Sequence, residues 1–147
     1  MPQSIYTQVL LLIIVCVSLF AFWQGEREER QAAAVLVMTN MGELLVQQLM
    51  GVFSKQYGAF AIDLAAMGLL GMIAWRSTRG WPIWAASFQA VSAAVLLAGL
   101  AGLRVSQQAY AAAVNLADYG VVGSVAVGVF MVWREREALA GSSRPLV

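Results

Sequence analysis

Three acidic side chains lie inside long apolar stretches of the sequence: Glu43, Asp63 and Asp118. The amides that accompany them are Asn40, Gln47, Gln89 and Asn115. An acid at the centre of a membrane helix costs about 2.5–3.5 kcal/mol, so it is retained where it faces protein or water or carries a proton. These seven residues predict a polar pathway for protons, cations or a small polar substrate. The alternative interpretation is a set of hydrogen bonds between helices, each worth about 1 kcal/mol.

The expected depth of the acids differs along their helices. At about 1.5 Å per residue, Asp63 is expected roughly 9 Å below the outer end of its helix, and Glu43 and Asp118 roughly 15 Å deep. Asp63 is therefore expected to face a hydrated vestibule. Gln89 is expected to reach either Glu43 or Asp118.

The composition defines the elements that must position these acids. The chain has 147 residues, of which 61% are hydrophobic and 12% charged. A soluble domain is nearer to about 45–50% apolar and about 25% charged. The apolar runs are long enough for helices that cross a bilayer, which need about twenty residues. The sequence therefore predicts an all-α integral membrane bundle, with residues 1–147 forming a single transmembrane domain.

Five apolar segments are candidates for spans. They cover residues 5–23, 32–53, 57–75, 81–103 and 107–133, and residues 134–147 form a tail. Segment 32–53 carries a polar stripe with helical spacing. It either spans with its stripe facing protein or lies flat as an interfacial amphipathic helix, which leaves four spans.

Counting basic residues favours five spans. With five spans, one side of the membrane carries Lys55 and Arg104. The other side carries Arg27, Arg30, Arg76, Arg79, Arg134, Arg136 and Arg144. With four spans the split is four against five. Basic residues collect on the cytoplasmic side, so the sequence predicts a periplasmic N-terminus and a cytoplasmic C-terminus.

The turn between the third and fourth segments, residues 75–84, combines arginines with tryptophans. Trp prefers the membrane interface, and Pro82 suits the first turn of a helix. The predicted interface anchors are Trp23, Trp75, Arg76, Arg79, Trp81, Trp84 and Trp133. The charged run at residues 24–31 is expected to be a solvated connector or, alternatively, a docking site for a partner.

Small residues recur at every fourth position in the last two segments. They are Ala86, Ala90, Ala94, Ala98 and Gly102 in one segment, and Gly120, Ser124 and Gly128 in the other. Such stripes allow helix backbones to approach closely in lipid. We therefore expect the last two helices to pack tightly together.

Several kinds of chemistry are disfavoured by composition. The chain has no histidine and one cysteine, Cys16, which excludes histidine-ligated haem, the common zinc sites and an internal disulfide. A net charge of +1 offers no basic tract for nucleic acid. We expect no cofactor, no metal and no enzymatic activity. Asp118 beside Tyr119 is the single candidate for catalysis.

The pattern Arg79-x-Trp81-Pro82-x-Trp84-x-Ala86, followed by Ala109-Tyr110 at the start of the last segment, resembles small polytopic inner-membrane proteins of alphaproteobacteria. The resemblance implies a bacterial inner membrane and brings no activity.

Two functions follow as expectations. The first is a small accessory or assembly subunit of a larger inner-membrane complex, which holds other membrane subunits by helix packing in the lipid bilayer. The alternative is a homo-oligomeric transporter or channel, coupled to protons or cations, that uses Glu43, Asp63 and Asp118.

Overall fold

The computed structural model describes residues 2–49, 52–102 and 106–142, with the side chains at 2–4, 6–7, 52–56, 107 and 142 outside the description. Part of the second predicted span (50–51), Arg104, the Lys55 side chain and Arg144 with the rest of the tail from 143 lie outside the described residues. The described residues form five α-helices. These are α1 (Pro2–Gln24), α2 (Arg27–Leu49), α3 (Val52–Arg76), α4 (Trp81–Leu100) and α5 (Gln107–Ser142).

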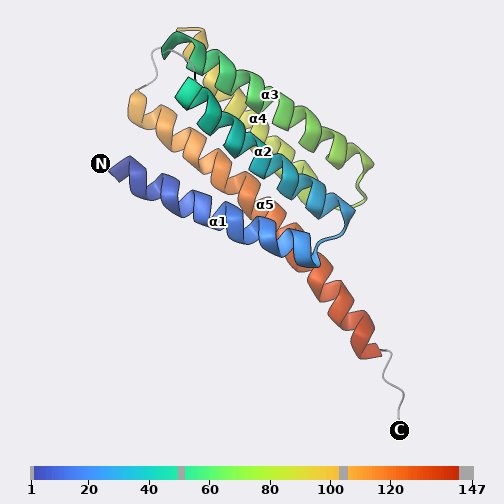
Figure 1. Cartoon of the computed structure of the whole chain (residues 1–147). Coiled ribbons are helices and arrows are strands. Elements are labelled where there is room, and N and C mark those ends of the chain that lie inside the picture. Colours follow the sequence, from blue (N-terminus) through green and yellow to red (C-terminus); the bar gives the residue numbers. More distant parts are fainter. Residues whose placement is uncertain (1, 50–51, 103–105, 143–147) are drawn as a thin grey trace.

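The five helices run alternately up and down and close into a ring (Figure 1). Each helix contacts the next along the chain, α1 contacts α5, and α2 also reaches α5 across the bundle. By length and composition, four helices are candidate membrane spans: Arg27–Leu49, Tyr57–Arg76, Trp81–Leu100 and Gln108–Gly141. Residues Gln8–Gln24 form a shorter apolar helix. The all-α prediction is confirmed, and the fold is that of a multi-pass membrane protein.

The second helix begins earlier than predicted. The run 24–31 is not a solvated connector, because α2 already starts at Arg27 and only Gly25 and Glu26 separate it from α1. Glu28 and Glu29 occupy its first turn, where the partial positive charge of a helix N-terminus stabilises acids. Packed between α1 and α3, α2 belongs to the ring rather than lying apart from it.

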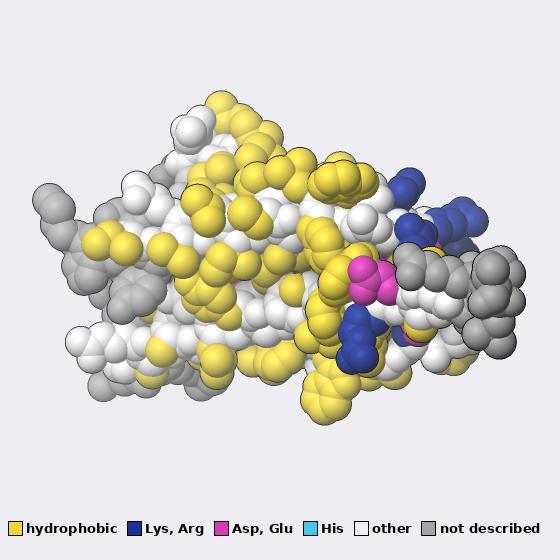
Figure 2. All heavy atoms as spheres, turned by 90° about the horizontal axis from the view of Figure 1, so that it is seen from below, with side chains coloured by type: hydrophobic (Ala, Val, Ile, Leu, Met, Phe, Trp, Pro, Cys, Tyr) yellow, Lys and Arg dark blue, Asp and Glu magenta, His cyan; other side chains and the backbone are white. Residues whose placement is uncertain are grey.

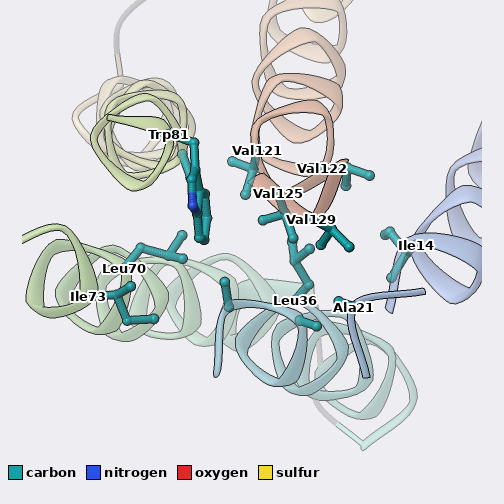
Figure 3. Close-up of a cluster of buried hydrophobic side chains, with 13 residues drawn as sticks. Ile14, Ala21, Leu36, Leu70, Ile73, Trp81, Val121, Val122, Val125 and Val129 are labelled. Carbon is teal, nitrogen blue, oxygen red and sulfur yellow. The ribbon is translucent and has the colours of Figure 1, made fainter. Parts of the chain in front are cut away.

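A cluster of buried apolar side chains fills the ring (Figure 3). Valines of α5 face Leu36 of α2, Leu70 of α3 and Ile14 of α1. Val125 and Val129 are fully buried at its centre. Lipid tails are as apolar as these side chains, so removal from water does not hold the helices together. The close fit of their side-chain contacts does.

The last two helices do pack together, although not through the predicted alanine stripe. Positions four apart drift by about 40° around a helix with each step, so a long stripe cannot stay on one face. The face of α4 that is buried carries Ala85, Gln89, Ser92, Ala93 and Leu96. Ala94 is exposed, and Ala86, Ala90 and Ala98 are only partly buried.

The glycines of α5 make room for aromatic rings of α4. A Cβ atom at Gly120 would lie 2.4 Å from the Phe88 ring, and one at Gly128 would lie 2.6 Å from the Trp81 ring. Ser124 is partly buried between them, and its hydroxyl donates to the Gly120 carbonyl at 2.7 Å. The two helices therefore pack with aromatic rings of α4 against glycines of α5, and not with small residues on both sides.

Gly102, predicted as a packing residue, instead ends α4. Its φ is +73°, a left-handed conformation that glycine adopts without strain. Its N–H donates to the Gly99 carbonyl at 3.1 Å, and the N–H of Ala101 donates to the Leu97 carbonyl at 2.9 Å. These bonds satisfy carbonyls at the helix C-terminus, so α4 ends at Leu100 rather than at residue 103.

Candidate functional site

The three intramembrane acids meet at one cavity. Glu43 from α2, Asp63 from α3 and Asp118 from α5 line a cavity of about 30 Å³, together with Asn40 and Gln89. We call the three acids around this cavity the carboxylate centre. Its volume is enough for a water molecule, which needs about 10–15 Å³ by the same measure. Three helices thus deliver one acid each to the same enclosed polar space.

Asp63 is the most deeply buried of the three, with 3% of its surface exposed. Its Oδ1 accepts a hydrogen bond from Gln89 Nε2 at 2.8 Å, and its Oδ2 accepts one from Ser92 Oγ at 3.1 Å. Both donors lie on α4, so these bonds join α3 to α4 inside the bundle. Gln89 therefore pairs with Asp63, and not with Glu43 or Asp118 as predicted.

Asp63 does not face an outer vestibule, because it is buried between α3 and α4 with 3% of its surface exposed. α3 begins at Val52, whereas the predicted span began at residue 57. Asp63 lies eleven positions after Val52, about 16 Å along the helix. A depth that looked shallow from the sequence is therefore well inside the bundle.

Two of the predicted pathway residues lie elsewhere. Gln47 and Asn115 are exposed and do not line the cavity. Sequence reasoning missed Ser92, which follows Gln89 by three residues and so shares its helix face. Thr39 also lines the cavity, while its hydroxyl donates to the Val35 carbonyl of its own helix at 2.8 Å.

The walls around the polar groups are apolar. Ile14, Leu36, Leu70, Val121 and Val122 line the same cavity and belong to the buried cluster in Figure 3. In such surroundings an acid is much cheaper to bury with its proton than without it. Among the described residues, no three acidic or cysteine side chains are close enough to hold a metal ion together. The chemistry that this arrangement suits is proton exchange between the acids and a water molecule, which the cavity is large enough to admit.

A second group of acids lies at the end of the bundle that holds the α1–α2 and α3–α4 turns, which we call the basic end. Arginine and acidic side chains gather there (Figure 2). Arg79 Nη1 lies 3.0 Å from Glu29 Oε1, and its Nη2 lies 3.4 Å from Glu26 Oε2 and 3.0 Å from Glu135 Oε2. These four residues are the ion-pair cluster. It ties the α1–α2 turn, the start of α2, the α3–α4 turn and α5 to a single guanidinium.

Glu29 is the buried member of this cluster, with no exposed surface. Its Oε1 also accepts from Trp81 Nε1 at 3.2 Å, and its Oε2 accepts from the Glu26 backbone N–H at 3.1 Å. Burial lowers the pKa of Arg79, but the charge of Glu29 and then those of Glu135 and Glu26 outweigh it and leave that pKa raised. The guanidinium thus stays charged at any physiological pH.

Two further contacts brace the same turns. The Ser77 hydroxyl donates to Glu28 Oε2, and the Arg30 Nε donates to the Gly25 carbonyl at 3.1 Å. A Cβ atom at Gly25 would lie 2.3 Å from the Ala21 carbonyl oxygen and 2.8 Å from Glu29 Cβ. Only glycine lets the chain turn this closely.

The predicted interface anchors divide into two groups. Trp23, Trp75, Arg76 and Trp84 are exposed and belong to the helix ends beside the α1–α2 and α3–α4 turns, and Trp133 of α5 is partly buried. Trp81 differs, because only 4% of its surface is exposed and its ring packs on Gly128. Arg79 differs as well, since it serves the ion-pair cluster. These two side chains hold the bundle together rather than facing the membrane interface.

Comparison with known proteins adds no relative: no family model, no curated protein and no solved structure matches the chain.

Proposed function

We propose that the protein is a small proton-coupled transporter or channel of a bacterial inner membrane, with the carboxylate centre as its proton-binding site. One observation carries this proposal. Acids from three different helices line one cavity inside a single chain, although each is costly to keep within a bilayer. Ionisable residues inside membrane helices are rare, and those that face the interior of a bundle mark candidate proton or ion pathways.

The three acids are proposed to have different roles. Gln89 and Ser92 hold the Asp63 carboxylate in place by hydrogen bonds. In this proposal the carboxylate serves as a proton acceptor at a fixed position. Among the described residues, no side chain donates a hydrogen bond to the carboxyl of Glu43 or Asp118, and these two exchange protons with water in the cavity. The small volume favours a proton over a larger substrate at this point.

Proton flux into liposomes containing the purified protein tests this proposal. The double variant Glu43→Gln with Asp118→Asn should lose most of the flux, because the amides keep the shape but cannot release a proton at neutral pH. Gln47→Ala with Asn115→Ala is the matched control, since these residues do not line the cavity. Unchanged flux in the acid variant would remove the carboxylate centre from the mechanism.

The proposed topology has five spans, a periplasmic N-terminus and a cytoplasmic C-terminus. It is supported by the gathering of arginines at the basic end. Starting from a Cys16→Ser background, Thr78→Cys at that end should react with an impermeant maleimide only after lysis, and Ser106→Cys at the other end should react in spheroplasts. The reverse pattern would invert the orientation.

A second candidate, an accessory subunit of a membrane complex, is favoured by the end of α5. This helix continues past Trp133 to Ser142, outside the ring (Figure 1), and residues 134–141 are exposed. A helical arm of this kind offers a surface to another subunit. If the chain is an assembly subunit, deletion from residue 137 onward should release a defined partner that co-purifies with the full chain in mild detergent. Purification of the full chain with no partner would count against it.

A further inference from the structure

A groove at the basic end collects arginines from two helices. It has a volume of about 660 Å³ and is lined by Arg27 and Arg30 of α2 and by Arg136 of α5. Gly25 and Glu26 of the α1–α2 turn also line this groove. All three arginines are exposed. The ion-pair cluster does not use them, so they are a separate feature of the same end.

The groove carries a positive balance of charge. Its one lining acid, Glu26, already lies 3.4 Å from Arg79. The Arg30 Nε donates to the Gly25 carbonyl, which fixes that guanidinium beside the groove. Planar guanidinium groups bind phosphate oxygens in pairs, so three of them suit a phosphate group.

An apolar groove continues from the arginines toward the middle of the bundle. It lies between α2 and α3, has a volume of about 280 Å³ and is lined by Leu69, Met72 and Ile73 among others. Gln31 and Ala34 line both grooves, so the two meet on the surface of α2. The second groove also opens at the helix ends, where Glu28 and Arg76 line it. Its apolar lining, from Ile73 to Leu69 of α3, continues from there one to two turns toward the middle of the bundle.

We propose that these joined grooves bind one anionic phospholipid, with its phosphate on Arg27, Arg30 and Arg136 and one acyl chain along the α2–α3 groove. Basic pockets between membrane helices bind anionic headgroups in this way, and each arginine near the surface adds about fivefold to the affinity. Across the joined surface, charged side chains lie at the helix ends and apolar ones toward the middle of the bundle, which matches the order of groups in a lipid. A free phosphate would use only the first groove.

Native mass spectrometry of the full chain, released from detergent with added phosphatidylglycerol, tests the proposal. The wild type should retain one tightly bound phosphatidylglycerol molecule and not phosphatidylcholine. The double variant Arg27→Gln with Arg136→Gln should bind it about 25-fold more weakly. Arg134→Gln is the matched control, because it removes an exposed arginine two residues from Arg136 but outside the groove.

A second variant tests the acyl groove without a change of charge. Ala34→Phe fills the junction of the two grooves and should weaken phosphatidylglycerol binding while thermal unfolding stays as in the wild type. Equal binding by the wild type and the arginine double variant would overturn the proposal. Inorganic phosphate that displaces the lipid at micromolar concentration would overturn the assignment to a lipid. Lipid binding unaffected by Ala34→Phe would overturn the placement of its acyl chain in the α2–α3 groove.

Discussion

Buried acids occur in two regions of this bundle, and the two regions satisfy them differently. At the basic end, Glu29 is completely enclosed and faces the Arg79 guanidinium at 3.0 Å. In the carboxylate centre, Asp63 is almost as deeply buried, yet its partners are the neutral Gln89 and Ser92. One acid is matched by a full positive charge and the other by an amide and a hydroxyl.

The difference separates a structural use of charge from a chemical one. A carboxylate and a guanidinium in contact at a buried position form a structural link, because removing either partner leaves the other without its counter-charge. An acid held by neutral donors can be present with or without a proton. The ion-pair cluster therefore suits permanent attachment of the two turns to α2 and α5, whereas the carboxylate centre suits reversible proton binding.

The largest expected effect comes from removing the positive partner. Arg79→Met leaves Glu29 buried without its cation, and breaking a buried pair in this way costs about 3–5 kcal/mol. Thermal unfolding in detergent, followed by circular dichroism, should show this loss. Arg76→Met, an exposed arginine three residues away, should change stability by no more than about 0.5 kcal/mol.

A rescue experiment sharpens the same comparison. The double variant Glu29→Leu with Arg79→Met removes both charges and should be more stable than Arg79→Met alone. If Arg79→Met unfolds at the same temperature as Arg76→Met, the ion-pair cluster does not hold the bundle together.

The next effect concerns the ring that donates to Glu29. Gly128→Ala places a methyl group against Trp81, and overpacking of this kind costs about 1–3 kcal/mol. Gly123→Ala on the same helix meets nothing within 4 Å and should leave stability unchanged or slightly higher. Equal unfolding temperatures for the two variants would show that Trp81 shifts away without cost.

A smaller effect is expected in the carboxylate centre. Ser92→Ala removes one of two hydrogen bonds to Asp63, which is worth about 1 kcal/mol. Ser87→Ala on the exposed face of α4 is the control, since that hydroxyl donates only to the Ile83 carbonyl of its own helix. A loss as large as that of Arg79→Met would mean that both regions are equally structural.

The smallest effect on stability is expected from neutralising the acids that face the cavity. Glu43→Gln and Asp118→Asn keep the size of each side chain and remove no hydrogen bond to it from a described side chain, so their free energy of unfolding should change less than that of Ser92→Ala. The same variants are expected to abolish proton flux. Variants that unfold several degrees lower but still conduct protons would reverse the roles assigned to the two regions.

Much of the candidate site could be predicted from residue types alone. An acid inside a long apolar run has to face protein or water, so Glu43, Asp63 and Asp118 stand out, and the structure brings all three to one cavity. Their partners could not be predicted in the same way. Whether Gln89 meets Asp63 or Glu43 depends on the length of α3 and on the rotation of α4, neither of which is written in local sequence.

The hairpin at residues 75–84 shows the same division. Its arginines and tryptophans identify a turn at the end of a membrane helix, because these residue types prefer interfaces. Composition could not reveal that Arg79 and Trp81 turn inward. That depends on Gly128 leaving room for the Trp81 ring and on Gly25 bringing Glu29 within reach.

The sequence by itself determined that the chain is helical and suited to a membrane, and which acids are out of place. It also placed the helix boundaries to within five residues, except the end of α5, which continues to Ser142 instead of ending at residue 133. Hydrophobic runs and charge counts are local or additive properties, so they can be evaluated from the sequence alone. Only the tertiary structure decided which buried acid is matched by a cation and which by neutral donors. That choice depends on the packing of side chains between neighbouring helices, where a rotation of a few tens of degrees exchanges one partner for another.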